Sequence, residues 1–181
     1  MKQINKYIYE RLHINKDIKS NIYNYHPKTK DELEELIDKL IEERGYNANL
    51  NDIDTSEITD MSYMFKESHF NGDISEWDVN NVKDMSSMFE YSEFAGKNGD
   101  ISNWDVSNVK NMESMFYYSQ FTCENGDISN WNVSNVQYMD YMFAYTEFNG
   151  DISNWDVSNV TDIRHMFDKS PLEKNPPKWY K

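Results

Sequence analysis

The sequence has a single cysteine and no long apolar run, and these two deficits exclude several classes of protein. Cys123 stands alone among 181 residues, so no disulfide can form within one chain. No stretch approaches the ~18 consecutive apolar residues of a membrane-spanning helix. Met1 and Lys2 are not followed by the apolar segment of a secretory signal. We therefore expect no signal peptide, no transmembrane segment, and a cytoplasmic or virion-associated location.

Groups that carry catalysis are also missing. The histidines are His13, His26, His69 and His165, and their spacing does not match that of metal ligands. The sequence contains no phosphate-binding glycine loop and no nucleophile elbow. Cys123 has no histidine nearby in sequence that could activate its thiol. We predict that the chain is not an enzyme and that it needs no cofactor.

The chain also has few positively charged residues relative to its negatively charged ones. Lys and Arg number 18 against 32 Asp and Glu, which gives a net charge of −14. Residues 1–48 carry nine basic and nine acidic side chains, so residues 49–181 hold the whole excess. Such a surface repels phosphate backbones and favours cationic partners or simple solubility. We expect a basic protein partner, and neither a nucleic acid nor a membrane as ligand.

One pattern of residues recurs five times and dominates the chain. It reads Asp-Ile-Ser-x-Trp-Asp-Val-Ser-Asn-Val-x-x-Met-x-x-Met-Phe. The dipeptide Asn-Gly immediately precedes each of the four fuller copies. The fuller copies begin at Asp73, Asp100, Asp127 and Asp151, and a weaker one begins at Asn49. Self-similarity at a period of 24 to 27 residues predicts units that stack and pack only on their neighbours.

Within one copy the apolar spacing changes. The apolar positions are Ile74, Trp77, Val79, Val82, Met85, Met88 and Phe89. The first three have the spacing of a strand entering a core, and the last four that of one helix face. Asn71-Gly72 then predicts a turn with positive φ. We predict an α/β solenoid of about five leucine-rich-repeat-like units, each with a short parallel strand and a short helix, in which the tryptophans stack in one column and the phenylalanines in another.

The two ends differ from the repeats. Thr29 and Glu32 have the spacing of a capping box, which predicts a helix over residues 30–44. Pro176 and Pro177 stand where the next strand would begin, and proline suits a terminal edge because it lacks a backbone donor. The predicted divisions are an N-terminal helical segment and cap at 1–48, the solenoid at 49–170, and a C-terminal cap at 171–181.

The run FNGDISNWDVSNVTDIRHMF at 148–167 resembles the BspA-like, DUF285-type repeats of bacterial surface proteins, which also occur in gut phages. The resemblance covers about residues 49–181. It implies a leucine-rich-repeat solenoid and a non-enzymatic adhesion or interaction module.

The N-terminal run MKQINKYIYERL is similar to the capsid-targeting leader of T4-type phage internal proteins. Ile8-Tyr9-Glu10 fits the site that phage prohead proteases cut after glutamate, so Glu10 is a candidate processing site. This likeness implies a protein packaged in a virion. An amphipathic opening helix is the alternative interpretation.

The first candidate binding surface is acidic. Between core positions of a leucine-rich strand, side chains face the concave side, and neighbouring rungs lie about 4.8 Å apart. The candidate residues are Asp54, Glu76, Asp78, Asn103, Asp105, Asn130, Asn132, Asn154 and Asp156. Such a ladder could bind a basic peptide or Ca²⁺, or it could be a solvated face. A second column, formed by Asp73, Asp100, Asp127 and Asp151, we interpret as turn chemistry.

The second candidate surface is an edge of tyrosines on the convex side. Tyr91, Tyr118 and Tyr145 occupy equivalent places in three copies. Exposed tyrosine is favoured at interfaces, although half-buried packing between neighbouring units is the other interpretation.

These observations favour a non-enzymatic protein–protein interaction module with an acidic concave surface, and a monomer. Two alternatives stay open at this point. One is a phage-packaged virion or internal protein, and the other is an acidic inhibitor that mimics nucleic acid.

Overall fold

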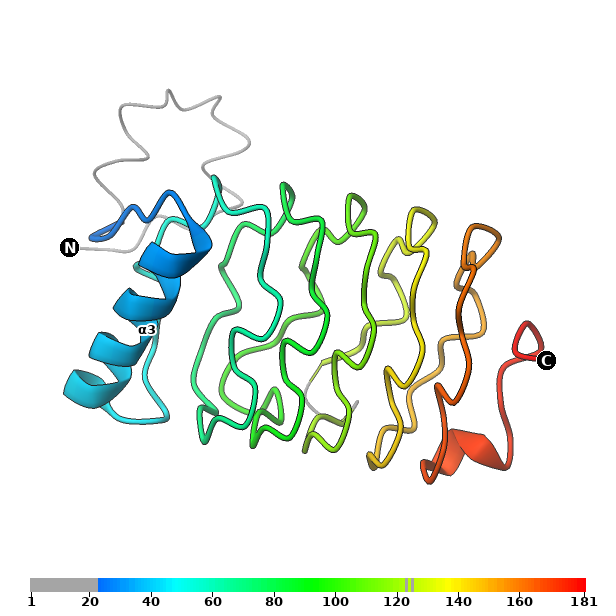
Figure 1. Cartoon of the computed structure of the whole chain (residues 1–181). Coiled ribbons are helices and arrows are strands. Elements are labelled where there is room, and N and C mark those ends of the chain that lie inside the picture. The colour runs from blue at the N-terminus through cyan, green and yellow to red at the C-terminus, as the bar shows by residue number, and fades with distance from the viewer. Residues whose placement is uncertain (1–22, 123, 125) are drawn as a thin grey trace.

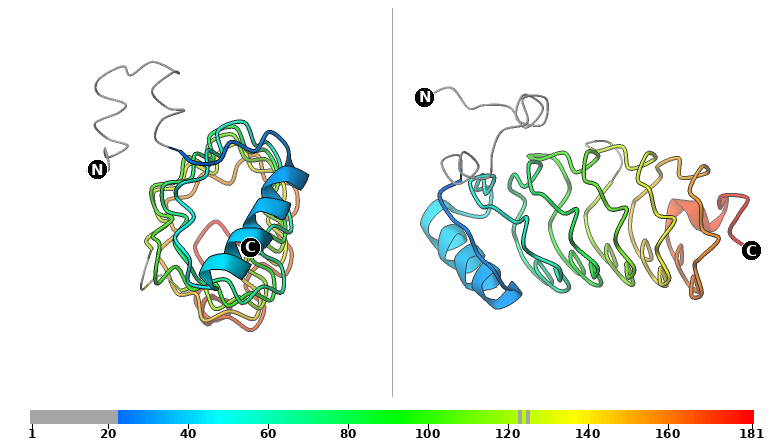
Figure 2. Two further views of the ribbon diagram at one scale, coloured as in Figure 1. Left: turned by 90° about the vertical axis from the view of Figure 1, so that its left-hand side faces the viewer. Right: turned by 90° about the horizontal axis from the view of Figure 1, so that it is seen from above.

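The computed structural model of the chain describes residues 23–122, 124 and 126–181. Five coils, beginning at Asn49, Asp73, Asp100, Asp127 and Asp151, follow one another along a single axis (Figure 1). Helix α3 (Lys30–Arg44) lies at the N-terminal end of this stack, and the short 3-10 helix η2 (Pro171–Glu173) lies at the other. Seen along the axis, the coils share one oval outline, and α3 crosses its open end (Figure 2). Within the described residues, no helix is both long and apolar enough to cross a membrane.

The predicted α/β solenoid, with a strand and a helix in each leucine-rich-repeat-like unit, is wrong. In the described part of the chain, both helices lie outside the repeats and no repeat contains a continuous strand. Consecutive coils are joined instead by isolated parallel bridges. These bridges are Asn49–Asp73, Asp60–Asp84, Asp84–Asn111, Asn111–Tyr138 and Tyr138–Asp162.

The backbone of each coil explains why the expected helix does not form. In residues 61–68, N–H groups alternate between two kinds of acceptor. Tyr63 N–H donates to Ser86 O of the next coil at 2.9 Å, whereas Lys66 N–H donates back to Tyr63 O at 3.0 Å. The result is a chain of overlapping turns, in which no bond runs four residues back as in a helix. Such turns also place an apolar side chain inward every third or fourth residue, so their pattern imitates a helix face.

Helix α3 confirms the helix expected at 30–44. Thr29 Oγ1 accepts a hydrogen bond from Glu32 N–H at 3.2 Å, which caps the first turn. Glu32 reaches back to the N–H of Lys28 at 2.6 Å, one residue earlier than a standard capping box. Leu33, Ile37 and Leu40 are buried, so the apolar face of the helix covers the first coil.

The core is a stack of identical rings, as expected. The phenylalanines of neighbouring coils lie nearly parallel, with centroids 5.6 Å apart for Phe65–Phe89 and for Phe89–Phe116. Each tryptophan also crosses the junction between coils. The indole N–H of Trp104 donates to Ile74 O at 3.3 Å, and the other four tryptophans make the equivalent bond at 3.0 to 3.2 Å. The indoles therefore bury apolar area and satisfy a buried carbonyl at once.

The C-terminal residues form part of a sixth coil. Trp179 donates its indole N–H to Ile152 O at 3.0 Å, which repeats the bond made by each earlier tryptophan. Leu172 is buried beside it. The stack therefore ends on side chains that continue its core.

Glycine in the Asn-Gly steps has a different role from the one predicted. Among described glycines, only Gly45 and Gly96 have positive φ, so Gly72 does not supply a left-handed turn. A Cβ on Gly72 would lie 2.0 Å from Ala48 O. The position requires glycine because the backbone of the preceding coil approaches so closely.

Candidate functional site

The acidic column predicted as a concave surface lies in a series of tight turns. It consists of Asp54, Asp78, Asp105, Asn132 and Asp156, one residue from each coil. In every case Oδ1 accepts a hydrogen bond from the backbone N–H two residues later, at 3.0 to 3.2 Å. Hydrogen bonds from Ser158 lower the pKa of Asp156 below its usual range. These side chains hold their own backbone, and the described part of the repeats contains no strand that would present them on a concave face.

The other members of that predicted surface do not converge. Glu76, Asn103, Asn130 and Asn154 are exposed, and no hydrogen bond joins one to another among the described residues. In the same part of the chain, no group of three or more His, Cys, Asp or Glu is arranged to hold a metal ion.

The interpretation of the second acidic column as turn chemistry is confirmed. Asp73, Asp100, Asp127 and Asp151 each accept a hydrogen bond from the N–H two residues later, at 2.8 to 3.0 Å. Hydrogen bonds from Ser129 lower the pKa of Asp127, so the local donors stabilise the charged form.

The tyrosine edge forms one continuous aromatic surface. Tyr91, Tyr118 and Tyr145 are 48%, 43% and 39% exposed. Their rings stack along the axis, with centroids 5.0 Å apart for Tyr91–Tyr118 and 4.3 Å for Tyr118–Tyr145. We call these three residues, together with Tyr117 and Tyr141, the tyrosine face.

Tyr117 lies at the centre of the tyrosine face. Its ring meets those of Tyr91, Tyr118, Tyr141 and Tyr145 edge-on, with centroids 5.0 to 5.9 Å apart. Burial raises the pKa of Tyr117 to about 12, and a hydrogen bond with Tyr91 adds to the effect. The hydroxyl therefore stays protonated at neutral pH. This ring fixes the positions of its four neighbours.

The backbone beneath the tyrosines is left-handed. Tyr91, Tyr118, Tyr141 and Tyr145 all have φ between 53° and 57°. A left-handed conformation costs a non-glycine residue about 1–2 kcal/mol, and asparagine or glycine would reduce that cost. The sequence places tyrosine at these positions instead.

Two carboxylates beside the tyrosine face, Glu113 and Asp140, have raised pKa values, and the charge of Arg164 opposes the rise at Asp140. Burial raises the pKa of Glu113, and the charges of Asp140 and Asp162 add to the effect. Burial likewise raises the pKa of Asp140, with Asp162 contributing. Among the described residues, neither Glu113 nor Asp140 forms an ion pair. Sequence reasoning missed both residues, although their shared place in aligned copies was a usable signal.

At both ends of this surface, basic side chains of the chain itself already lie against tyrosine rings. Lys66 Nζ lies 5.4 Å from the ring centroid of Tyr63 and 3.1 Å from Glu90. At the opposite end, the His165 ring stacks on Tyr141 at 4.9 Å, and His165 Nδ1 lies 2.9 Å from Asp168. Only the middle of the surface lacks such a group among the described residues.

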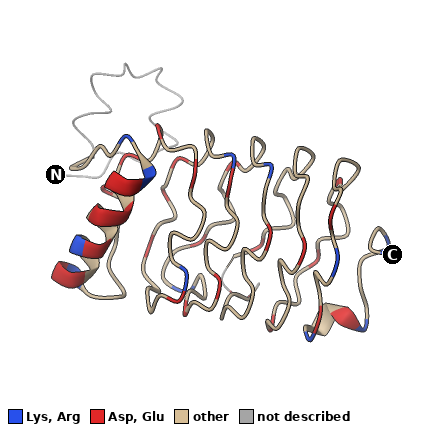
Figure 3. Cartoon of the chain, in the orientation of Figure 1, with Lys and Arg blue, Asp and Glu red and all other residues tan. Residues whose placement is uncertain are grey.

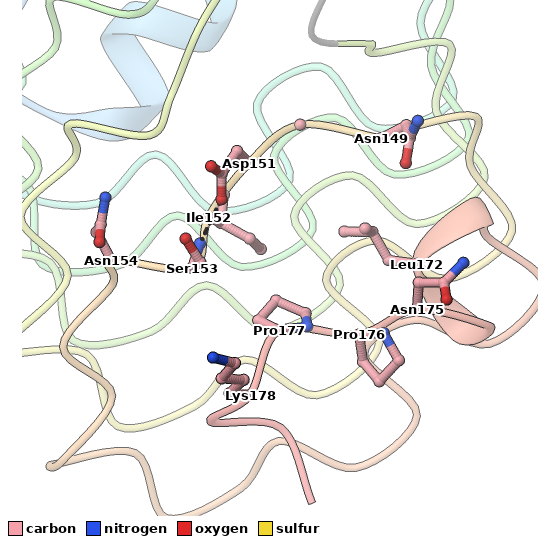
Figure 4. Close-up of a pocket in the computed structure, with 11 residues that line it drawn as sticks. Asn149, Asp151, Ile152, Ser153, Asn154, Leu172, Asn175, Pro176, Pro177 and Lys178 are labelled. Carbon is pink, nitrogen blue, oxygen red and sulfur yellow. Dashed lines mark hydrogen bonds between the residues drawn. The ribbon is translucent and has the colours of Figure 1, made fainter.

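A cavity of about 590 Å³ lies at the C-terminal end, between the fifth coil and the partial sixth coil. Asp151 and Ser153 line one side of it, and Pro176, Pro177 and Lys178 lie across from them (Figure 4). It opens where proline interrupts the backbone bonds that join the coils elsewhere. The predicted processing site at Glu10 lies outside the described residues.

Comparison with known proteins identifies a family for the chain and gives no individual relative. A family described as "Mycoplasma protein of unknown function, DUF285" matches the chain over residues 6–122 and again over 90–180. No curated protein matches the chain, and no solved structure does.

Proposed function

Because the chain belongs to the DUF285 family, we propose that it is a non-enzymatic protein–protein interaction module that binds a basic partner through its tyrosine face. The exposed stack of Tyr91, Tyr118 and Tyr145 carries this proposal. In the described residues, every large exposed apolar side chain is a tyrosine, and half of those six residues form this one stack. Contiguous exposed aromatic area marks interaction sites, and tyrosine is enriched among residues that dominate binding energy.

The strained backbone supports the same conclusion. Left-handed positions favour asparagine or glycine when stability alone matters. Tyr91 and Tyr118 occupy such positions with nearly half of each side chain in solvent. Two places in the unit are left-handed in all five coils, so the conformation belongs to the repeat, and it is the choice of exposed tyrosine there that supports a functional role.

Charge determines the class of partner. Residues 49–181 carry the entire net charge of −14, and the coils show many acidic positions and few basic ones (Figure 3). A field of one sign steers partners of the opposite sign and makes association sensitive to salt. The unpaired carboxylates of Glu113 and Asp140 place part of this charge beside the aromatic rings.

The tyrosine face is a better candidate than the acidic column predicted first. Oδ1 of Asp105 and Oδ1 of Asp156 each already accept a backbone hydrogen bond, so a partner at these oxygens would compete with the turns that they stabilise. The tyrosine face needs no such exchange. The resemblance to BspA-like repeats, whose members are interaction modules, supports this class of function and gives no support for the fold.

A triple substitution tests the proposal. Tyr91→Asn, Tyr118→Asn and Tyr145→Asn remove the rings and suit the left-handed backbone, so the protein should stay folded. Proteins captured from a lysate by the wild type at low salt would be identified, purified and measured by calorimetry. We expect a basic protein whose affinity falls at least tenfold with the triple variant. Tyr46→Ser, which alters an exposed tyrosine elsewhere, is the matched control and should leave the affinity unchanged.

The opposite pattern would refute the proposal. If the purified partner binds the triple variant as tightly as the wild type, the tyrosine face is not the site. If Asp78→Asn with Asp105→Asn weakens binding instead, the acidic column is the site.

A further inference from the structure

The first coil shows how this surface holds an ammonium group. Lys66 Nζ lies over the Tyr63 ring at 5.4 Å and pairs with Glu90 of the next coil at 3.1 Å. Lys30 Nζ lies 5.6 Å from the centroid of the same ring and 3.6 Å from Asp60. Each lysine is therefore held by this tyrosine ring and by at least one carboxylate, and Lys30 also lies 3.8 Å from Glu34 and donates to Ser62 Oγ at 2.8 Å. A cation near an aromatic ring is attracted by the quadrupole of the ring.

The fourth coil repeats the tyrosine without the lysine. Tyr141 occupies the place of Tyr63, with φ 57° against 63°. Ala144 occupies the place of Lys66, and its side chain is too short to reach a ring. His165 of the fifth coil stacks on one side of Tyr141 at 4.9 Å. On the other side the equivalent residue of the third coil is Ser114, and the Tyr117 ring of that coil meets Tyr141 edge-on at 5.9 Å rather than stacking on it.

Carboxylates lie where these two coils meet, beside the bond from Ser114 N–H to Asp140 O at 2.9 Å. Glu113 precedes Ser114 on the third coil, and Asp140 precedes Tyr141 on the fourth. Neither forms an ion pair among the described residues, and the charge of Asp140 helps to raise the pKa of Glu113. Arg164 of the fifth coil opposes the rise in the pKa of Asp140, but its guanidinium pairs with Asp162. A ring and a carboxylate, the kinds of group that hold Lys66 in the first coil, are thus present here, and the charged groups that shift the pKa of Glu113 are all carboxylates.

We infer that the space between Tyr141 and Ser114, flanked by Glu113 and Asp140, binds a lysine side chain of the partner. The ammonium lies over the Tyr141 ring and pairs with the carboxylates, as Lys66 does on Tyr63. This inference rests on the proposed function, because it specifies the partner's contact residue at one end of the tyrosine face. Lysine is favoured over arginine because both internal examples on this surface are lysines.

A short lysine peptide is the direct probe. Calorimetry at low salt would measure binding of an acetylated, amidated tetralysine peptide to the full chain. Glu113→Gln and Tyr141→Asn should each weaken it about 2- to 5-fold, the range expected for one exposed ion pair or one cation–π contact. Glu147→Gln changes the net charge equally at an exposed position without a described contact, so it should have little effect.

Two further measurements make the result decisive. A tetranorleucine peptide, which keeps the chain length without the charge, should not bind. Ser114→Lys supplies an ammonium from the protein itself and should abolish peptide binding; Lys169 already adopts the same left-handed conformation elsewhere in the stack.

The outcomes separate this inference from the proposed function. Equal weakening by Glu113→Gln and Glu147→Gln would overturn it, since the attraction would then be long-range. Tetraarginine that binds more than tenfold tighter than tetralysine would overturn the choice of lysine. If the partner is lost with the triple tyrosine variant but retained with Tyr141→Asn and Glu113→Gln, the proposed function stands and this inference fails.

Discussion

Replacing Gly72 with alanine tests the account of how neighbouring coils meet. The added Cβ would lie 2.0 Å from Ala48 O and 2.6 Å from the Phe70 ring, whereas relaxed contacts lie at about 3.5 Å. Because Ala48 O is backbone, it can retreat only with its coil. That carbonyl also accepts the hydrogen bond from Asp73 N–H at 2.9 Å, so any retreat weakens the junction.

The magnitude follows from three contributions. Overpacking costs about 1–3 kcal/mol, and loss of one hydrogen bond costs about 0.5–1.5 kcal/mol. Restriction of the unfolded chain by alanine returns about 0.4–1 kcal/mol. We expect Gly72→Ala to lower the free energy of unfolding by about 0.5–4 kcal/mol.

Gly126 provides the matched control for this experiment. A Cβ there would lie 3.0 Å from Asp100 Oδ1, the end of a side chain, and otherwise 3.9 Å from its nearest neighbours. We expect Gly126→Ala to change the free energy of unfolding by less than about 1 kcal/mol. Urea unfolding followed by tryptophan fluorescence would measure both variants. Equal losses in the two variants would refute the reasoning, as would a loss below about 0.5 kcal/mol for Gly72→Ala.

Three other predictions concern single contacts. Trp104→Phe removes the indole donor to Ile74 O and leaves unfilled volume. Thermal unfolding should therefore show a free energy of unfolding that is lower by about 1–3 kcal/mol. An unchanged melting temperature would contradict the indole's role. Asn135→Asp replaces the amide that donates to Ser107 O at 2.7 Å with a carboxylate. This substitution should destabilise the protein by about 1–3 kcal/mol at pH 7 and by much less below pH ~4, because the protonated acid can donate the hydrogen bond again. A loss of stability that does not vary with pH would contradict the prediction. Because the folded state raises the pKa of Glu113 above 4.5, ionisation of Glu113 lowers stability as pH rises through that raised pKa. Glu113→Gln should therefore raise the melting temperature at pH 7 but not at pH 3.5, and equal shifts at both would disprove the assignment.

The sequence alone was enough to predict the repeats, the helix and the stacked core. The period located each coil, because residues such as Trp104 and Phe116 make the same contacts with the preceding coil as their equivalents do in the other copies. Helix α3 followed from its cap at Thr29 and its apolar face. These features depend on local chemistry and on spacing, and both can be read directly from the residues.

The secondary structure within a coil could not be predicted in the same way. Inward residues such as Met85, Met88 and Phe89 fit a helix face and a chain of turns equally well. Left-handed residues distinguish the two, but they are tyrosine and serine here, as at Ser87 and Tyr91, rather than glycine or asparagine. The usual sequence signal for a left-handed position was therefore absent.

The sequence likewise predicted one part of the candidate site and misassigned another. The stack of Tyr91, Tyr118 and Tyr145 followed from alignment of the copies. The acidic column was assigned to binding although Asp105-Val-Ser107 has the same Asp-x-Ser spacing as Asp73-Ile-Ser75, which was correctly assigned to a turn. Glu113 and Asp140 share one place in the aligned copies, where other coils carry serine or arginine, so alignment of the copies could have predicted that they lie side by side.

The bond from each indole to the preceding coil has a consequence for the length of the protein. Every junction uses the same donor and the same acceptor, so any unit can follow any other. A duplication or deletion of one whole unit within the gene would leave both ends intact and every remaining junction complete. Gain or loss of one unit would thus lengthen or shorten the aromatic surface by one ring. Gene duplication or deletion would in this way match the surface to partners of different size.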